Sequence, residues 1–201
     1  IKGLSYLEDG QPRHNPDRPL IQNLDVNPIP DFKLVSRELE ESDILNILTI
    51  QTKRGCPYDC SFCTVTTHDG KKLRKHSVDK VIEMVEYYAS LNPQFLFFAD
   101  DIFNLPVDYA KEVLNEMVER NITPRWGAQV RQEAAFDPEL LELMRESNCD
   151  RVYVGFESVS QESLDSVNKK TTVEEMRRAI ESFRKHKIHI HGMFIGGMKT
   201  D

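Results

Sequence analysis

The stretch ILNILTIQTKRGCPYDCSFC (44–63) joins a run of apolar residues to a loop that contains three cysteines. Residues 44–52 predict a buried β-strand, because the run is short, apolar and rich in β-branched side chains. Cys56, Cys60 and Cys63 follow in a C-x-x-x-C-x-x-C pattern. The loop after this strand therefore delivers three thiols into one small volume.

Four more apolar runs follow the first, and amphipathic helical patterns alternate with them along the chain. This alternation predicts parallel strands joined by crossover helices. Buried runs without clean polar alternation also fit a parallel sheet that is covered by helices. We therefore expect an α/β fold that binds its ligands at the carboxyl ends of the strands. The predicted strands are residues 44–52, 95–99, 125–130, 151–157 and 188–196.

Residues 1–43 differ from the rest of the chain and predict a lead-in or linker. Asp9 and Gly10 predict the turn of a small hairpin, and a proline-punctuated extended stretch follows it. Residues 44–201 then form the predicted core. Because the alternating pattern stops just past the fifth predicted strand, we expect this core to be truncated there.

The composition limits the classes of protein that need to be considered. The formal net charge of the 201 residues is −7, which argues against nucleic acid or anionic lipid as a partner. No apolar run approaches the roughly 20 residues of a membrane-spanning helix. Three of the four cysteines are clustered, which predicts a reduced, cytoplasmic protein and not a disulfide framework. The sequence does not indicate the oligomeric state.

Three clustered thiolates suit a soft metal ion or an iron–sulfur cluster. Ferredoxin clusters and structural zinc sites usually have four protein ligands, so three suggest a cluster with one iron open to another group. Two other classes remain open at this point. One is an electron-transfer iron–sulfur protein with a closed cluster. The other is a zinc-stapled α/β binding module in which His68 or His76 completes the site.

The cysteine pattern, with Phe62 directly before the last cysteine and a strand before the loop, resembles that of the radical S-adenosylmethionine (SAM) enzymes. The resemblance covers about residues 45–201. It implies that Cys56, Cys60 and Cys63 are catalytic ligands of a [4Fe–4S] cluster whose fourth iron chelates SAM.

The same resemblance implies the reaction and the fold. An electron from the cluster would cleave SAM to methionine and a 5′-deoxyadenosyl radical, which abstracts hydrogen from a small-molecule substrate. Reduced ferredoxin or flavodoxin would supply that electron. The implied fold is a partial parallel (β/α)6 barrel of the TIM type, of which five strands are visible in this sequence.

Candidate SAM contacts follow from the resemblance at three strand ends. An Ala-Asp-Asp sequence occupies the place of the family's Gly-Gly-Glu-like motif, so Asp100, or else Asp101, would bind the SAM ammonium group. Glu157 and Ser158 lie where family members contact the ribose hydroxyls and the methionine part. Arg131 pairs either with the SAM carboxylate or with a structural ion-pair partner.

The last predicted strand resembles the family's adenine-binding motif. HGMFIGGMK (191–199) places Gly192, Phe194 and Gly196 in register with that motif. The resemblance implies that the backbone of this strand pairs with adenine while Phe194 or Ile195 packs on its face. The backbone position of Phe62 makes it a further candidate.

The lead-in and the motifs WGAQVR and VGFESVSQESL resemble one subgroup of the family. This subgroup includes anaerobic magnesium-protoporphyrin monomethyl ester cyclase-like proteins and cobalamin-dependent methylases. The resemblance therefore implies oxidative cyclisation or cobalamin-dependent methyl transfer, with cobalamin bound by a domain outside this chain. Polar residues at several strand ends favour an enzyme over the electron-transfer and zinc alternatives, because neither alternative requires them.

Overall fold

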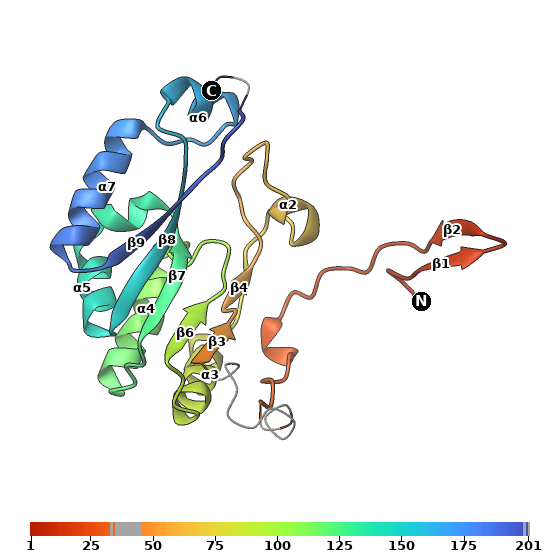
Figure 1. The fold of residues 1–201 in the computed structure, drawn as a ribbon. Coiled ribbons are helices and arrows are strands. Elements are labelled where there is room, and N and C mark those ends of the chain that lie inside the picture. Colours follow the sequence, from red (N-terminus) through yellow and green to blue (C-terminus); the bar gives the residue numbers. More distant parts are fainter. Residues whose placement is uncertain (33, 35–45, 199, 201) are drawn as a thin grey trace.

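The structure is a computed structural model that describes residues 1–32, 34, 46–198 and 200. Its centre is a five-stranded parallel sheet in the order β3–β6–β7–β8–β9 (Figure 1). These strands match the five predicted ones, so the predicted α/β fold with a parallel sheet is confirmed. Their bounds are β3 (Ile47–Ile50), β6 (Phe95–Phe98), β7 (Trp126–Val130), β8 (Cys149–Glu157) and β9 (His189–Phe194).

Crossover helices between the strands cover one face of the sheet (Figure 1). The side chains of Ser77, Asp137 and Thr172 each accept a hydrogen bond from the first turn of the helix that follows, as N-cap residues do. The longer helices are α3 (Val78–Ser90), α4 (Val107–Glu119), α5 (Pro138–Glu146) and α7 (Val173–Lys185). Shorter elements are α2 (Val65–His68), α6 (Gln161–Ser166), the 3-10 helix η3 (Gln132–Phe136) and a small ladder of β4 (Lys53–Arg54) with β5 (Arg74–Lys75).

The two faces of the sheet carry different side chains, because successive residues of a strand point in opposite directions. On β8, Val152, Val154 and Phe156 are buried in the hydrophobic core. Tyr153 points to the opposite face, where its ring centroid lies 5.3 Å from that of Phe97. The helix-covered face is therefore apolar, whereas the inner face carries aromatic and polar groups.

The predicted N-terminal hairpin is present. β1 (Ser5–Glu8) pairs antiparallel with β2 (Gln11–His14) around the turn at Asp9 and Gly10. The hairpin extends away from the sheet (Figure 1). The predicted boundary between the lead-in and the core falls outside the described residues.

The later part of the lead-in packs against the start of α3. Leu24 of the 3-10 helix η1 (Leu24–Val26) is fully buried. The carboxylate of Asp25 accepts a hydrogen bond from the backbone N–H of Ser77 at 3.0 Å and pairs with Nδ1 of His76 at 2.9 Å. This segment is therefore docked on the sheet domain by an apolar contact and a charged one.

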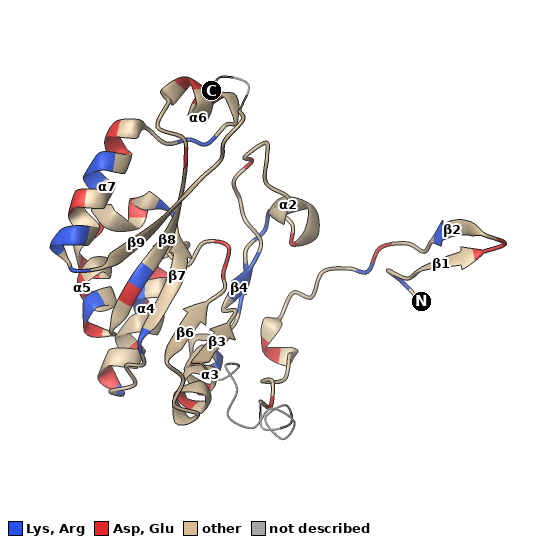
Figure 2. Ribbon diagram, viewed as in Figure 1, with Lys and Arg blue, Asp and Glu red and all other residues tan. Residues whose placement is uncertain are grey.

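Charges of both signs are interspersed along α5 and α7, the outer helices of the sheet (Figure 2). Mixed charge is typical of a solvated helical face. Within the part of the chain that the structure describes, no helix is both long enough and apolar enough to cross a membrane.

A buried ion pair joins the carboxyl ends of β3 and β6. Asp100 is fully buried, and one of its oxygens lies 2.8 Å from Nζ of Lys53, which is 2% exposed. The same carboxylate accepts hydrogen bonds from the backbone N–H groups of Thr52 and Lys53 at 2.6 and 3.1 Å. Burial lowers the pKa of Lys53, and the charge of Asp100 opposes that shift.

We expect Asp100→Asn to destabilise the fold, because the variant leaves the ammonium of Lys53 buried without its counter-ion. Breaking such a pair on one side costs about 3 kcal/mol in the free energy of unfolding. Urea unfolding followed by the fluorescence of Trp126, the only tryptophan, measures this change.

Two controls sharpen this test. Asp108→Asn removes an exposed carboxylate and should change the unfolding free energy by less than about 0.5 kcal/mol. The double variant Lys53→Met/Asp100→Asn removes both charges, keeps an acceptor for the backbone N–H groups of Thr52 and Lys53, and should recover much of the loss. An Asp100→Asn protein as stable as the Asp108→Asn control would contradict the structural role of this pair.

Candidate active site

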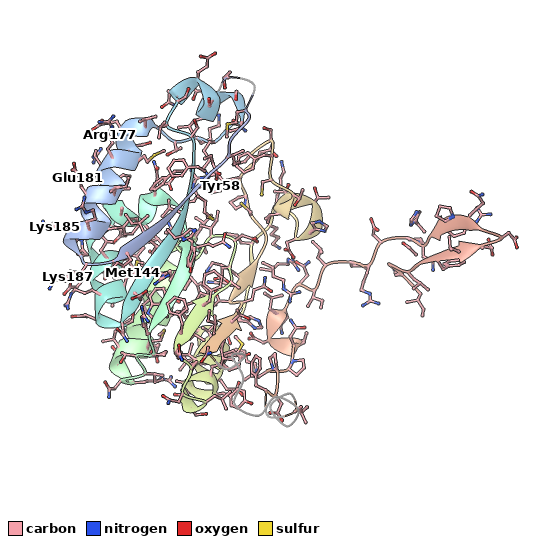
Figure 3. All side chains as sticks on the ribbon, viewed as in Figure 1. Tyr58, Met144, Arg177, Glu181, Lys185 and Lys187 are labelled. Atoms are coloured by element: carbon pink, nitrogen blue, oxygen red, sulfur yellow. The ribbon has the colours of Figure 1, made fainter. Side chains whose placement is uncertain are left out.

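A cavity of about 200 Å³ lies at the carboxyl ends of the strands, between the cysteine-bearing loop and the inner face of the sheet. This is the position at which parallel α/β folds bind ligands. Tyr58, at the centre of the loop, lies on the side that faces the sheet (Figure 3). The predicted site residues that line the cavity are Cys56, Cys60, Phe62, Cys63, Asp101, Arg131 and Glu157.

The backbone of the loop requires a glycine directly before the first cysteine. Gly55 has a φ of +96°, and a Cβ at this position would lie 2.5 Å from the carbonyl oxygen of Lys72. The N–H of Cys56 donates a hydrogen bond to the carbonyl of Gly70 at 3.1 Å. The loop therefore begins in a fixed position against the segment that leads to β5.

The other side of the loop is held by the segment that follows α6. The N–H of Ser61 donates to the carbonyl of Val167 at 3.2 Å, and the side-chain amide of Asn168 donates to the carbonyl of Asp59 at 3.1 Å. Both sides of the cysteine loop are thus anchored by hydrogen bonds to other segments.

All four cysteines are free thiols, and three of them face the cavity. Cys56 is buried, and burial raises the pKa of its thiol, with the nearby Cys63 adding to the shift. Cys60 and Cys63 are partly exposed. Cys149 is buried in the core at the start of β8, which is the opposite end of the sheet from the cavity. The chain therefore offers three thiolates at this site and holds its fourth cysteine elsewhere.

These residues fit an iron–sulfur cluster better than a single metal ion. Among the described residues, no three His, Cys, Asp or Glu side chains are placed to hold one ion. A cluster takes one thiolate on each of several irons, so its ligands need not converge on one point. His76 is bonded to Asp25, and His68 is exposed on α2, so both candidate zinc ligands lie outside the cavity wall.

The structure reverses the predicted order of the two aspartates. Asp100, favoured from the sequence, is fully buried and occupied by Lys53 and Thr52, so it is not available to a ligand. Asp101 lines the cavity, and its Oδ2 is buried without a hydrogen-bond partner among the described residues. Burial raises the pKa of Asp101, and the charge of Asp69 adds to the shift. Asp101 is thus the acidic group that a cation in the cavity would meet.

Glu157 reaches the cavity through a local distortion at the end of β8. Its φ is +63°, and the register between β8 and β9 shifts between Gly155 and Glu157. Its Oε1 accepts a hydrogen bond from Nζ of Lys169 at 2.8 Å. Nζ of Lys169 in turn lies 5.9 Å from the ring centroid of Phe62. The carboxylate, the ammonium and the aromatic ring therefore form one wall.

Arg131 forms the structural ion pair that the sequence left open as one of two possibilities. Its guanidinium is bonded to both oxygens of Glu133, at distances of 2.8 to 3.2 Å. It also lies 4.0 Å from the ring centroid of Tyr58. Arg131 is thus a wall of the cavity whose charge is already balanced within the protein.

On β9 the structure places the predicted aromatic contact on the wrong face. Phe194 lies on the helix-covered side, where its ring centroid is 5.9 Å from that of Phe156, and it is 58% exposed. Met193, one residue earlier, lines the cavity instead. Ile195 follows the end of β9, and its N–H donates to the carbonyl of Glu157 at 2.9 Å.

Two further predicted contacts lie away from the cavity wall. The hydroxyl of Ser158 accepts a hydrogen bond from the N–H of Ser160 at 3.1 Å, which stabilises the turn before α6. Gly196 is exposed, and a Cβ at this position would meet no atom within 4 Å.

Several cavity residues were not predicted from the sequence. Gln129 is a polar residue inside an apolar strand, which is a signal that strand alternation could have found. Tyr153 and Met193 share the inner face with it for the same reason. Tyr58 lies within the cysteine loop itself. Lys169 follows α6, and its role depends on a tertiary contact that no local pattern indicates.

The fold and the three-thiol site define an iron–sulfur enzyme core of the α/β class. The sequence profile of the radical SAM superfamily matches residues 50–201 of the chain. The chain therefore belongs to the radical SAM superfamily, and the closed-cluster and zinc alternatives are set aside.

Curated relatives extend this result. An uncharacterized methyltransferase of Pyrococcus horikoshii is 34% identical over the whole chain and is matched over 44% of its own length. The bacteriochlorophyllide d C-12(1)-methyltransferase of Chlorobaculum tepidum is 31% identical over 86% of the chain and 38% of its own length. The anaerobic magnesium-protoporphyrin IX monomethyl ester cyclase of Rubrivivax gelatinosus is 28% identical over the whole chain and 37% of its own length. The chain thus spans less than half of these relatives.

Solved structures share the fold. The radical SAM methyltransferase TsrM from Kitasatospora setae, determined with cobalamin and a [4Fe–4S] cluster bound, is 26% identical and has a TM-score of 0.70 over 76% of this chain and 31% of that protein. The cobalamin-dependent radical SAM enzyme OxsB has a TM-score of 0.78 over 97% of this chain and 29% of that protein, at 22% identity. The fold expected of a partial barrel is thus found in solved radical SAM enzymes.

We expect Gly155→Ala to displace the carboxylate of Glu157, because the added Cβ would overlap Oε1 of Glu157 and lie 3.1 Å from Nζ of Lys169. Such overpacking should lower the free energy of unfolding by about 1–2 kcal/mol. Chemical denaturation measures the change, and Gly196→Ala, which adds a Cβ in open space, is the matched control.

A second background tests the cause of that loss. In a Glu157→Ala background, the same glycine substitution should cost less than half as much, because the overlapping carboxylate is gone. An unchanged cost in that background would show that the strain arises elsewhere.

Proposed function

We propose that residues 44–201 form the catalytic core of a radical SAM enzyme and that residues 1–43 are a lead-in that docks on α3. One observation carries the proposal: three thiols and the unpartnered carboxylate of Asp101 line the same cavity, while Cys149 is buried at the opposite end of the sheet. A cluster with three protein ligands needs a fourth from a small molecule, and a buried carboxylate beside it suits a cationic amine.

The position of each residue in the cavity wall suggests its role. Cys56, Cys60 and Cys63 would hold a [4Fe–4S] cluster, which when bound supplies the one-electron reduction of SAM that defines the superfamily. Asp101 would accept the hydrogen bonds of the SAM ammonium. Oε2 of Glu157 makes no hydrogen bond to the described residues, so it is available to a ribose hydroxyl while Oε1 stays bonded to Lys169.

Other residues would shape the cavity. Phe62 and Met193 contribute apolar side chains to its wall, which suits a flat base such as adenine. Ile195 presents its backbone at the end of β9 beside Glu157. Arg131 and Tyr58 form a further side of the cavity, with the guanidinium 4.0 Å from the ring centroid.

For the reaction on the acceptor, we propose methyl transfer that depends on cobalamin held outside this chain. The likeness to a methyltransferase over the whole chain at 34% identity supports it, as does the likeness to the cobalamin-bound TsrM structure. Oxidative cyclisation is the second candidate, since a cyclase is 28% identical over the whole chain.

The partners follow from this chemistry. We propose a small-molecule acceptor and a low-potential electron donor such as reduced ferredoxin or flavodoxin. A reducing compartment such as the cytoplasm suits three unpaired thiols in one loop.

We expect the protein, reconstituted anaerobically with iron and sulfide, to bind about four irons and to show a reduced-cluster electron paramagnetic resonance signal that changes when SAM is added. Cys56→Ala, Cys60→Ala and Cys63→Ala should each lose most of the iron and the signal, because each removes one of three ligands.

Cys149→Ala is the matched control for that experiment. It removes a buried thiol far from the cavity and should leave the iron content and the signal unchanged. A cluster that survives any of the three loop substitutions, or a signal indifferent to SAM, would contradict the proposed function.

We expect Asp101→Asn to weaken SAM binding by about tenfold, because the variant replaces a charge-assisted hydrogen bond with a neutral one. Equilibrium binding of SAM to the reconstituted protein measures the change. Asp59→Asn, an exposed carboxylate of the cysteine loop, is the control and should bind SAM as the wild type does. Equal affinity in the two variants would exclude Asp101 as the ammonium ligand.

A further inference from the structure

A second cavity adjoins the cysteine pocket. It has a volume of about 330 Å³, within the range of small-molecule sites, and lies between the segment after β6 and η3. Tyr58, Ile102 and Arg131 line both cavities and so form their shared wall. A molecule in the second cavity would therefore lie directly beside the proposed SAM site.

Most of the wall of the second cavity is apolar. Leu105, Val107, Ala134 and Phe136 contribute to it. One face of the Phe136 ring is covered by the guanidinium of Arg178 at 5.0 Å, and the side chain is 37% exposed. An aromatic ring held in this way suits a flat apolar ligand.

The charged residues of this wall are already paired within the protein. Arg131 is bonded to both oxygens of Glu133. Asp137 pairs with Lys111 at 2.9 Å and caps α5. A charged ligand would have to break one of these pairs, so the cavity favours a neutral one.

Asn104 supplies one polar donor that the protein does not use. Its side chain is 92% buried (8% exposed) and lines the cavity. Its Oδ1 accepts a hydrogen bond from the backbone N–H of Arg131 at 2.9 Å. Because a backbone N–H can only donate, this bond fixes which end of the amide is oxygen. Nδ2 therefore points the other way and makes no hydrogen bond to the residues that the structure describes.

We propose that the second cavity is the subsite for the acceptor substrate, and that it takes a neutral aromatic molecule carrying a carbonyl-type acceptor for Nδ2 of Asn104. The inference rests on the proposed function, since the second cavity would bind the acceptor substrate of that enzyme next to SAM. Tyr58, Ile102 and Arg131 border both cavities, so they would contact both ligands and orient one against the other.

Two probes of the same shape test this proposal. 3-Acetylindole carries the carbonyl, and 3-ethylindole lacks it. Binding to the cluster-loaded protein with saturating SAM is followed by ligand-observed saturation-transfer nuclear magnetic resonance. We expect 3-acetylindole to bind about tenfold more tightly than 3-ethylindole, because only it can use the buried donor.

Two variants identify the site. Asn104→Asp keeps the acceptor for the N–H of Arg131 and replaces the donor with an oxygen, so it should abolish the preference for 3-acetylindole. Phe136→Ala should weaken both probes several-fold, because it removes the aromatic wall. Tyr6→Ala, which removes an exposed aromatic ring from β1, is the control and should weaken neither.

The outcomes separate this inference from the proposed function. Equal binding of the two probes, or a preference that persists in Asn104→Asp, overturns the subsite while SAM titration of the same sample still supports the enzyme. Competition between the probes and SAM overturns the subsite as well. Failure of the wild type to bind SAM overturns the proposed function, and the assignment of an acceptor subsite falls with it.

Circular dichroism of each variant establishes that it is folded, and Phe136→Ala tests the site independently of Asn104→Asp.

Discussion

The buried pair of Asp100 and Lys53 is the interaction on which the geometry of the site depends. It joins the ends of β3 and β6, and the cysteine loop begins directly after Lys53 and Arg54. A lysine that is 2% exposed has to keep its counter-ion, so the chain cannot leave β3 in another direction without exposing or discharging it. The next residue, Asp101, is then the one left to face the cavity. This one contact thus supports both the sheet and the start of the cysteine loop.

Much of the fold could be predicted from the sequence because local patterns determine it. Five apolar runs became five parallel strands, and the capping side chains of Ser77, Asp137 and Thr172 mark helix starts that are visible in the sequence. The face of a strand is less easily predicted when apolar residues occupy both sides of it. The sequence around Phe194 and Met193 is of that kind, so the motif did not indicate that Met193, and not Phe194, lines the cavity.

Two adjacent carboxylates show the other limit of sequence reasoning. Asp100 and Asp101 have the same chemistry, and nothing local distinguishes them. Lys53, 47 residues earlier in the chain, decides which of them is structural. The same holds for Arg131, whose charge is balanced by Glu133, so a residue that suits a ligand carboxylate is already engaged by the protein. Ligand-type residues can be predicted from sequence, but their availability is a property of tertiary contacts.

The segment from the end of β8 through α6 to Lys169 links the two halves of the site. It begins with Glu157, whose carboxylate enters the cavity, and ends with Asn168 and Lys169. The side-chain amide of Asn168 holds the carbonyl of Asp59 in the cysteine loop, while Lys169 holds Glu157. One short segment therefore contacts the loop that carries the proposed cluster ligands and also holds the proposed SAM contact Glu157. Because these contacts share one backbone, the spacing between the cysteine loop and the carboxylate of Glu157 is set by this segment as much as by the sheet.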